Sequence, residues 1–317
     1  MTGCSPDLSV VLPVYNEEEN LTELHSRLTT VLQKLTNDYE IIFVNDGSVD
    51  NTQNILLSLA RRDPSVKVIK FTRNFGHHIA VTAGLDYCRG KVVVIMDADL
   101  QDQPEEIPKL LAKMSENYDI VYGIRENRRD SWFKRFTSKL FVAALKRLTS
   151  YNIDINSNMF RVMSRRVIDS LASMKETDRY LLGLISYTGY PQTGIKVNHG
   201  ERFAGRTKYS LRKMLRLSVN AITSFSVKPL NYIGMFGVFV SMLSFAAAGY
   251  LIYRRLVLKL GVEGWTSIMV SLFLVSGIQL LSLGIIGEYI GRIFTQVRNR
   301  PLYIIESITE EPKGQVN

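Results

Sequence analysis

A short apolar run that ends in acidic residues is the feature that most constrains how this chain folds. Residues 92–96 read Val-Val-Val-Ile-Met, and Asp97, Ala98 and Asp99 follow them directly. A β-branched, apolar run of this length is typical of a strand buried within a parallel sheet. In open α/β sheets, ligands bind outside the carboxyl ends of such strands. We therefore expect Asp97 and Asp99 to lie at a ligand-binding edge.

Carboxylate oxygens at this position suit Mg²⁺ or Mn²⁺. Mg²⁺ is usually held by one or two carboxylates together with substrate phosphates and water. One interpretation is a metal clamp on a diphosphate, with Asp97 and Asp99 as the ligands. The alternative is a polar loop before a helix that starts near Pro104, because acidic turns are common. In either case we expect Asp102 to cap that helix.

Strands and helices alternate through the first part of the chain. This alternation is typical of βαβ units and a mostly parallel sheet. Three of the first four expected strands end in an acid or amide followed by a turn, so these groups should share one edge. No G-x-x-x-x-G-K-[ST] or G-x-G-x-x-G motif follows a strand, which disfavours P-loop NTPases and dinucleotide-binding enzymes. Strands are expected at 8–15, 39–44, 66–72, 91–96 and 119–124.

The region after the fifth strand is less regular. Residues 132–148 have an apolar side and a basic side. They fit either a helix packed on the domain or a basic helix at a membrane interface. Residues 180–185 are expected to form a buried helix, and residues 195–198 an outer strand.

A basic loop forms the second candidate site. Arg202, Arg206 and Lys208 lie close together with a glycine and hydroxyl groups. Three cations in this setting form a plausible phosphate cradle. The alternative is a solvated basic loop before a membrane segment. Residues 210–225 continue as an amphipathic helix that we expect to lie in the headgroup plane.

Two uncharged runs, at 232–253 and 266–286, are long enough to cross a bilayer. Basic residues on their outer flanks outnumber those in the connecting loop, which predicts that the large N-terminal domain and both termini are cytoplasmic. A bacterial inner membrane is the expected location. The net charge of +9 suits anionic partners such as phosphates or an anionic membrane face. Cys4 and Cys88 are expected to be free thiols.

The C-terminal part contains a G-x-x-x-G motif at Gly287 and Gly291 and a possible short strand at 302–305. Both features favour a homo-oligomer. The tail from Ser307 onward is expected to be disordered.

Four motifs, in this order, resemble the family 2 glycosyltransferases. They are Pro-Val-Tyr-Asn-Glu at 13–17, Val-Asn-Asp-Gly-Ser at 44–48, Asp-Ala-Asp-Leu-Gln-Asp at 97–102 and the basic loop at 202–209. With the two apolar runs, they more narrowly resemble polyprenyl-phosphate glycosyltransferases, the group of dolichol-phosphate mannose synthases and bacterial bactoprenol glucosyltransferases. The resemblance covers roughly residues 8 to 300. It implies a GT-A fold, a nucleotide-diphosphate sugar donor, a divalent metal (Mg²⁺ or Mn²⁺) and inversion at the anomeric carbon.

The resemblance also implies roles for individual residues. Nucleotide-sugar binding falls to Pro13, Tyr15, Glu17, Asp46, Asp97, Ala98, Asp99 and Gln101, with Asp46 reading the base. Asp97 and Asp99 would serve the ribose-diphosphate and the metal. Arg202, Arg206 and Lys208 would bind the lipid phosphate. The catalytic set would be Asp97, Asp99, Asp154, Arg206 and Lys208. One departure concerns Asp154: Ser157-Asn158-Met159-Phe160-Arg161 stands where relatives often have Gly-Asp/Ser-Phe-Arg.

The expected function is inverting transfer of a hexose, with glucose from UDP-glucose as the first candidate, to polyprenyl (undecaprenyl) phosphate at a lipid bilayer. Nucleic acid is not an expected partner. Alternatives are mannosyl or modified-arabinosyl transfer, a processive polysaccharide synthase, and a non-enzymatic scaffold with an inactive nucleotide fold. The expected domains are a cytoplasmic GT-A domain at 1–208, amphipathic juxtamembrane helices at 209–230, two transmembrane helices at 231–294 and a cytoplasmic tail at 295–317.

Overall fold

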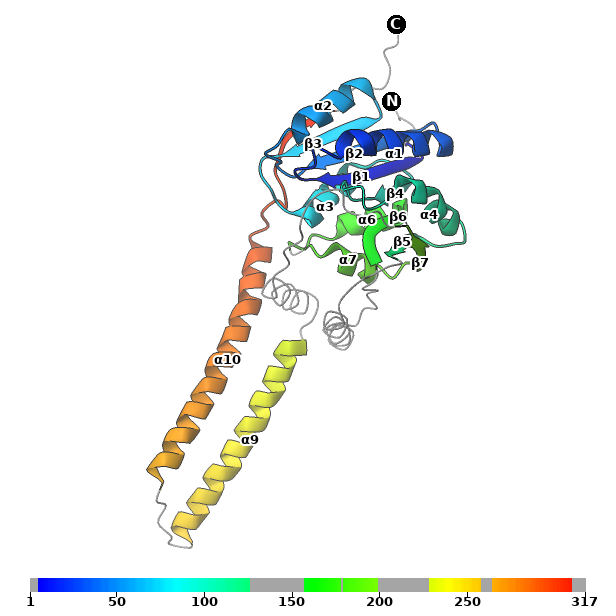
Figure 1. Ribbon diagram of the computed structural model, residues 1–317. Coiled ribbons are helices and arrows are strands. Elements are labelled where there is room, and N and C mark those ends of the chain that lie inside the picture. Colours follow the sequence, from blue (N-terminus) through cyan, green and yellow to red (C-terminus); the bar gives the residue numbers. More distant parts are fainter. Residues whose placement is uncertain (1–4, 126–156, 178, 199–227, 258–263, 310–317) are drawn as a thin grey trace. The chain divides into compact units, whose positions relative to one another are not determined.

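A computed structural model of the chain describes residues 5–125, 157–177, 179–198, 228–257 and 264–309. These residues fall into two compact units. The first unit holds the described residues up to 198 together with those from 301 onward, and the second holds residues 228–257 and 264–300. The first is an α/β unit and the second consists of two long helices (Figure 1).

An eight-stranded sheet forms the centre of the first unit, in the order β7-β5-β6-β4-β1-β2-β3-β8. Neighbouring strands from β4 through β1 and β2 to β3 are parallel, as are β5 and β7. Strand β6 is antiparallel to both its neighbours, and β8 is antiparallel to β3. The prediction of a mostly parallel α/β sheet is therefore confirmed. The strands are β1 (Leu8–Val14), β2 (Tyr39–Asn45), β3 (Val66–Phe71), β4 (Val92–Ile95), β5 (Ile120–Arg125), β6 (Ser157–Ser164), β7 (Gln192–Val197) and β8 (Ile305–Thr309).

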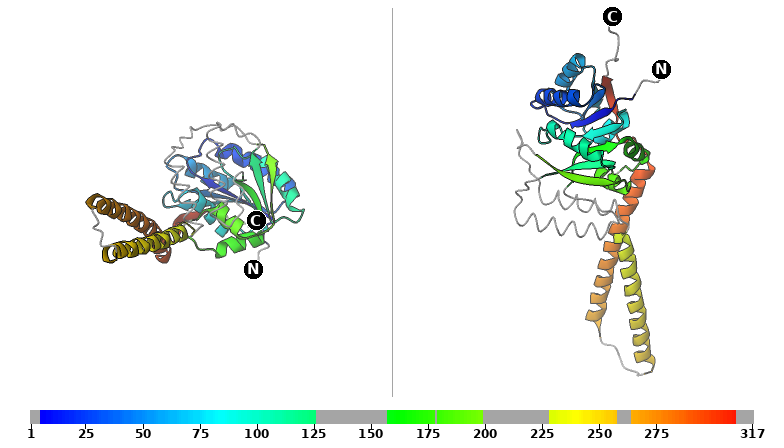
Figure 2. Two further views of the ribbon diagram at one scale, coloured as in Figure 1. Left: turned by 90° about the horizontal axis from the view of Figure 1, so that it is seen from below. Right: turned by 90° about the vertical axis from the view of Figure 1, so that its right-hand side faces the viewer.

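Helices cover both faces of this sheet (Figures 1 and 2). On one face α1 contacts α2 and η1, and α4 follows η1 directly; on the other face α3 packs on β1 and β2 and contacts α6, which contacts α7. The predicted buried helix at 180–185 corresponds to α7, and the predicted outer strand at 195–198 overlaps the end of the edge strand β7. The helices are α1 (Leu21–Leu35), α2 (Thr52–Arg62), α3 (His77–Tyr87), the 3₁₀ helix η1 (Pro104–Glu106), α4 (Ile107–Met114), α6 (Arg165–Ser173) and α7 (Leu181–Tyr187).

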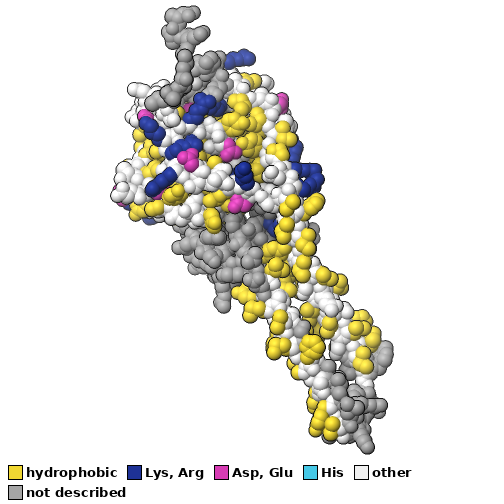
Figure 3. Space-filling model, turned by 180° about the vertical axis from the view of Figure 1, so that it is seen from behind, with side chains coloured by type: hydrophobic (Ala, Val, Ile, Leu, Met, Phe, Trp, Pro, Cys, Tyr) yellow, Lys and Arg dark blue, Asp and Glu magenta, His cyan; other side chains and the backbone are white. Residues whose placement is uncertain are grey.

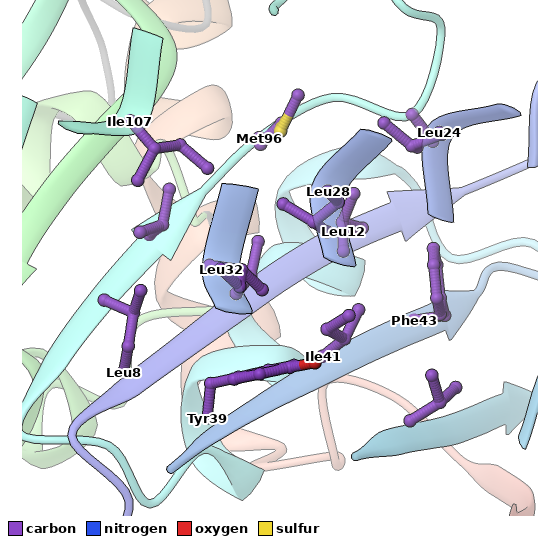
Figure 4. Close-up of a cluster of buried hydrophobic side chains, with 14 of the residues drawn as sticks. Leu8, Leu12, Leu24, Leu28, Leu32, Tyr39, Ile41, Phe43, Met96 and Ile107 are labelled. Carbon is purple, nitrogen blue, oxygen red and sulfur yellow. The ribbon is translucent and has the colours of Figure 1, made fainter. Parts of the chain in front are cut away.

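The core explains why the strands are apolar throughout. Alternate residues of each strand point to opposite faces, so Leu12 faces α1 while Val11 faces α3. On the α1 side, leucines at helical spacing, including Leu28, pack on the strands with no exposed surface (Figure 4). On the α3 side, a Cβ added at Gly84 would lie 2.2 Å from the side chain of Val11. Glycine at this position therefore lets α3 lie close against β1.

Strand β8 corrects the expectation for the C-terminal tail. Residues 307–309 were expected to be disordered, but they pair with β3, which places Lys70 opposite Ser307. The chain before β8 is also fixed: the Tyr303 hydroxyl donates to Asp86 at 2.8 Å, and its ring stacks on Phe71 with centroids 5.2 Å apart. Pairing satisfies backbone groups that β3 would otherwise present as an open edge. The polar composition of the tail concealed this strand.

We predict that Tyr303→Ala lowers the stability of the full-length chain. The substitution removes a stacked ring and a hydrogen bond, together worth about 1–3 kcal/mol. In a unit of this size the apparent melting temperature should fall by about 3–8 °C. Tyr303→Phe should cost less, because it removes only the hydrogen bond. Tyr187, whose side chain is 58% exposed, offers a control; if Tyr303→Ala melts no lower than Tyr187→Ala, β8 does not depend on this anchor.

The second unit consists of α9 (Lys228–Leu256) and α10 (Trp265–Val297), which run side by side. In the described part of the chain, one helix is long and apolar enough to cross a membrane, at Ile268–Val297 with a mean hydropathy of 2.2. Helix α9 contains a shorter apolar stretch, Tyr232–Ala247. Figure 3 shows apolar side chains along the helices. Phe245 of α9 is 80% exposed.

Candidate active site

The carboxyl ends of four parallel strands meet at one edge of the sheet. The strand registers align Val14 of β1 with Asn45 of β2, Asn45 with Lys70 of β3, and Val11 of β1 with Ile95 of β4. The loops after β1, β2 and β3 therefore begin side by side, and the loop after β4 begins beside the last residues of β1. The prediction that the polar strand ends share one edge is confirmed.

The loops after β1 and β2 are hydrogen-bonded to each other. The Asn16 amide donates to Ser48 Oγ at 3.0 Å, and Asn16 Oδ1 accepts from the Val49 amide at 2.9 Å. Asn16 has a φ of 55°, a left-handed conformation that asparagine tolerates better than most residues. The neighbouring Tyr15 is 46% exposed, while Pro13 is buried. Tyr15 is thus presented to solvent from a fixed loop.

Glu17 lies at the start of the same loop pair. Its amide donates to Thr52 Oγ1 at 3.0 Å, and its carboxylate accepts from the Asn20 side chain at 2.6 Å. These contacts fix the backbone of Glu17 to the start of α2 and its carboxylate to the start of α1.

Asp46 holds the loop that follows β3. Its two carboxylate oxygens accept the amides of Phe75 and Gly76 at 2.6 and 2.9 Å. Asp46 is only 3% exposed, and burial raises the pKa of its carboxyl although both amides oppose the rise. The next residue, Gly47, has a φ of 69°, and a Cβ there would lie 2.5 Å from the backbone of Arg73. The loops after β2 and β3 are therefore in close contact.

Asp97 is hydrogen-bonded to a histidine that the sequence motifs did not identify. His77, the first residue of α3, lies with Nε2 2.8 Å from Asp97 Oδ1. The two side chains are 44% and 30% exposed, so both remain accessible. Burial lowers the pKa of His77, but the hydrogen bond to Asp97 and the nearby carboxylates outweigh it, and the pKa is raised. The available signal was a histidine pair after the third strand, at the edge that carries the acids.

Asp99 lies in a turn of unusual backbone geometry. The Gln101 amide donates to Asp99 Oδ1 at 3.1 Å, and between them Leu100 has a φ of 60°. A left-handed leucine costs about 1–3 kcal/mol, and such strain tends to occur at functional sites. Ala98, between the two acids, is buried. Residues 97–101 thus belong to the loop that follows the end of β4 at Ile95.

The metal prediction can be judged from the donor groups. Among the described residues, no group of three or more His, Cys, Asp or Glu side chains could hold a metal. Asp97 and Asp99 can supply at most two carboxylate ligands. This donor set fits Mg²⁺ or Mn²⁺ that shares its remaining positions with phosphate oxygens and water.

The expectation for Asp102 was wrong. The helix after this loop has Gln103 at its N-cap position, with no side-chain capping hydrogen bond. Asp102 is instead 2% exposed. A short 3₁₀ turn begins with Pro104, which has no amide hydrogen and so needs no capping there.

Several predicted site residues lie outside the described residues: Asp154, Arg202, Arg206 and Lys208, together with the helices expected at 132–148 and 210–225. The described residues that were predicted to bind a nucleotide sugar lie at one edge of the sheet, after strands β1, β2 and β4 or near their carboxyl ends.

A buried polar region lies next to His77. His78 is packed edge-to-face against Tyr180, with ring centroids 5.8 Å apart, and Arg161 of β6 is 2% exposed. Burial, followed by the charge of His77, lowers the pKa of His78 to about 4. Arg161 lowers it further, while Asp97 opposes the shift. His78 is therefore neutral at physiological pH.

We predict that His78 makes the fold sensitive to mild acid. An unfolded histidine has a pKa near 6.5, so the unfolded state binds the extra proton first as the pH falls. Stability from this group should be complete above about pH 6.5 and should decline as the pH falls towards about 4. Melting curves of the full-length chain across this range would measure it. His78→Asn should flatten the profile; an unchanged slope would assign the acid sensitivity to other groups.

Comparison with known proteins agrees with this geometry. Residues 9–172 match the model of the family described as Glycosyl transferase family 2. The chain is 44% identical over 299 residues to the uncharacterized glycosyltransferase YkcC of Bacillus subtilis (strain 168), covering 94% of this chain and 93% of that protein. It is 42% identical over 303 residues to an uncharacterized glycosyltransferase of Synechocystis sp., covering 95% of each.

A solved structure shares the fold. Glucosyl-3-phosphoglycerate synthase from Mycobacterium tuberculosis, in complex with Mn²⁺, UDP and phosphoglyceric acid, aligns with a TM-score of 0.50 and 19% identity. The alignment covers 69% of this chain and 76% of that one. At this identity the likeness shows the fold alone, a GT-A-like α/β architecture.

Proposed function

The chain belongs to glycosyl transferase family 2, and from this premise we propose that it transfers a hexose from a nucleotide-diphosphate sugar to polyprenyl phosphate. The proposal of a lipid acceptor rests on α10. This apolar helix is long enough to cross a bilayer, and it belongs to the same chain as a family 2 glycosyltransferase domain. A membrane-anchored transferase acts where lipid substrates lie. The basic sequence between 202 and 216 adds cations suited to a phosphate headgroup.

The donor would bind at the carboxyl edge of the sheet. Pro13, near the carboxyl end of β1, would contact the nucleotide together with Tyr15 and Glu17 from the loop that follows. Asp46, whose carboxylate holds the loop after β3, would shape the base pocket. The proposed donor contacts of the loop after β4 are Asp97, Ala98, Asp99 and Gln101.

A divalent cation fits this edge, as the two carboxylates of Asp97 and Asp99 leave positions for diphosphate oxygens. When bound, Mg²⁺ or Mn²⁺ would neutralise the charge of the departing diphosphate. The Mycobacterium tuberculosis synthase, which shares the fold, was crystallised with Mn²⁺ and UDP. That complex supports a divalent metal and UDP as the first combination to test here.

The acceptor needs little activation. A phosphate monoester has its second pKa near about 6, so at neutral pH it is mostly a dianionic nucleophile. Its oxygen would attack the anomeric carbon as the bond to the nucleotide diphosphate breaks, with inversion. Bringing two anions together is chiefly a problem of positioning and charge neutralisation. Arg202, Arg206 and Lys208 are proposed for that task, and Asp154 is proposed to lie near the acceptor.

Glucose from UDP-glucose is the proposed donor sugar, with mannosyl or modified-arabinosyl transfer as alternatives. A processive polysaccharide synthase is less favoured, because the sequence lacks the Gln-x-x-Arg-Trp motif. A non-enzymatic scaffold is disfavoured by the acids at Asp46, Asp97 and Asp99.

The proposed membrane arrangement has two spans within 231–294, contributed by α9 and α10, with the 1–208 domain, the 209–230 helices and the 295–317 tail on the cytoplasmic side of a bacterial inner membrane. Its support is the apolar surface of both helices and the basic flanks.

A homo-oligomer is also proposed. A Cβ at Gly287 or Gly291 would meet no described atom within 4 Å, so this face of α10 is open to another helix.

We predict that Arg206→Ala and Lys208→Ala each reduce transfer by about 10- to 100-fold. Each change removes a charge-assisted contact worth about 1.5–3 kcal/mol if it is fully formed in the transition state. Arg206→Lys should restore activity only in part, because a bidentate fork becomes a point charge. Rates of polyprenyl-phosphate glycosylation, beside calorimetric donor binding, separate acceptor from donor roles. Near-normal transfer by the Arg206→Ala, Lys208→Ala double variant would indicate that the loop is only a solvated basic segment.

A radiolabelled-sugar assay tests the proposed function. The full-length chain in detergent is incubated with Mn²⁺, labelled UDP-glucose and either polyprenyl phosphate or no acceptor. The proposal predicts label in the organic phase only with the lipid. Label in a long water-soluble polymer would indicate the processive synthase, and failure to transfer from any of a panel of nucleotide sugars would favour the scaffold.

A further inference from the structure

The hydrogen bond between His77 and Asp97 joins two loops of the candidate site. His77 begins α3, which follows β3, whereas Asp97 follows β4. In the sheet order, β1 and β2 lie between these two strands. The 2.8 Å contact of Nε2 with Oδ1 therefore spans the same edge at which the donor is proposed to bind.

The backbone that leads into His77 is held by a second acid of the site. Asp46 accepts the amides of Phe75 and Gly76, the two residues before His77. Gly76 has a φ of 106°, which glycine adopts without strain, and its carbonyl accepts the amides of Ile79 and Ala80 in the first turn of α3. Asp46 thus fixes the backbone that carries His77, and His77 in turn contacts Asp97.

A second histidine–carboxylate pair, outside the candidate site, provides a comparison for the His77–Asp97 contact. His25 Nε2 of α1 lies 2.9 Å from Asp63 Oδ2, and each side chain is 17% exposed. Asp63 follows α2 and precedes β3, so this pair lies towards the amino end of the strand and away from the candidate site. The His77–Asp97 pair is more exposed, and it holds one of the two acids proposed to meet the donor. Exposed ion pairs contribute little to stability.

We propose that His77 is a positioning residue that orients the Asp97 carboxylate for donor binding, an inference that rests on the proposed function of this edge. By donating to Oδ1, His77 restricts rotation of the carboxylate and leaves its other oxygen to meet the ribose-diphosphate or its metal. Residues that orient a ligating group in this way typically change affinity or activity by 10- to 100-fold when they are replaced.

Nucleotide binding, measured without lipid, tests the proposal. Calorimetric affinity for UDP in the presence of Mn²⁺ is compared for the full-length chain, His77→Ala, Asp97→Ala and the double variant. His77→Ala should weaken UDP binding by about tenfold or more in the wild-type background. In the Asp97→Ala background it should cause no further loss, because the group on which it acts is gone. His77→Gln, which keeps an N–H donor, should recover part of the affinity.

His25→Ala is the matched control: it breaks a histidine–carboxylate pair of similar geometry and should leave UDP affinity unchanged. If His77→Ala weakened UDP binding by the same factor in the wild-type and Asp97→Ala backgrounds, the proposal would be overturned. That result would indicate that His77 contacts the nucleotide directly. Unchanged affinity in His77→Ala would overturn it as well. Because no lipid is present, these outcomes do not depend on the acceptor. A wild-type chain that binds neither UDP nor GDP would overturn the donor site itself, and this inference with it.

Discussion

Asp99→Ala is expected to reduce sugar transfer by about 100- to 1,000-fold or more while the chain stays folded. Asp99 is proposed to hold the divalent metal on the donor diphosphate, and loss of one such charge-stabilising group commonly costs that factor. The side chain makes a local turn contact with the Gln101 amide at 3.1 Å, so its removal should disturb the fold little. The rate of transfer to polyprenyl phosphate and the melting temperature, measured together, check both parts.

Asp169→Ala provides the control for this substitution. Asp169 is an exposed acid on α6, paired with Arg165 at 2.8 Å, outside the candidate site. Its replacement should leave transfer unchanged. If the Asp99→Ala variant retained full activity in the presence of EDTA, neither Asp99 nor a divalent metal would be part of the reaction.

Asp46→Ala is expected to weaken both the fold and nucleotide binding. Its carboxylate is the acceptor for the amides of Phe75 and Gly76, and leaving a buried donor without a partner costs about 1–3 kcal/mol. We expect a loss of about 3 kcal/mol in the free energy of unfolding, a fall of about 6–12 °C in melting temperature for a unit of this size. Nucleotide affinity should fall by about 100-fold, which corresponds to a loss of about 2.7 kcal/mol in the free energy of binding.

The companion variant is Asp46→Asn, which keeps the size of the side chain but turns one acceptor into a donor facing a backbone amide. It should be nearly as damaging as Asp46→Ala. Asn74→Ala is the control, because this exposed side chain lies in the same loop while the contacts to Asp46 come from the following backbone amides. Wild-type stability in Asp46→Asn would show that the loop is held by other contacts.

The sequence predicted those parts of the site that follow directly from a strand. A buried strand is apolar along its length, so the residue at which polarity appears marks its carboxyl end. This is why the positions of Asp46 and Asp97 in the chain were enough to place each of them at a strand end. Parallel strands then bring their ends to one edge, which placed both acids together without knowledge of the loops.

Contacts made by loops between distant strands could not be predicted in the same way. The position of His77 beside Asp97 depends on how Asp46 holds the backbone of Phe75 and Gly76. Neither contact produces a periodic pattern in the sequence. Strand β8 pairs with β3 although Lys70 and Glu306 are 236 positions apart. Strand β6 runs antiparallel between β4 and β5, which the alternation of strands and helices did not indicate.

Helix α10 shows a related limit. The uncharged run predicted a helix at 266–286, but α10 continues to Val297. Beyond the uncharged run, Glu288 and Arg292 form an ion pair at 2.9 Å one turn apart, which lets charged residues continue the helix. An uncharged run therefore predicts the apolar part of such a helix but not the residue at which the helix ends.

The proposed transfer of a hexose to polyprenyl phosphate can be tested by the chemical identity of the lipid product. The full-length chain is incubated with Mn²⁺, UDP-glucose and undecaprenyl phosphate, and the extracted lipid is examined by mass spectrometry and NMR. The proposed function predicts a product heavier than the acceptor by one hexose residue, with a single phosphate in a phosphodiester and inverted configuration at the anomeric carbon. A lipid with two linked phosphates, retained configuration, or no lipid product with any nucleotide sugar would contradict it.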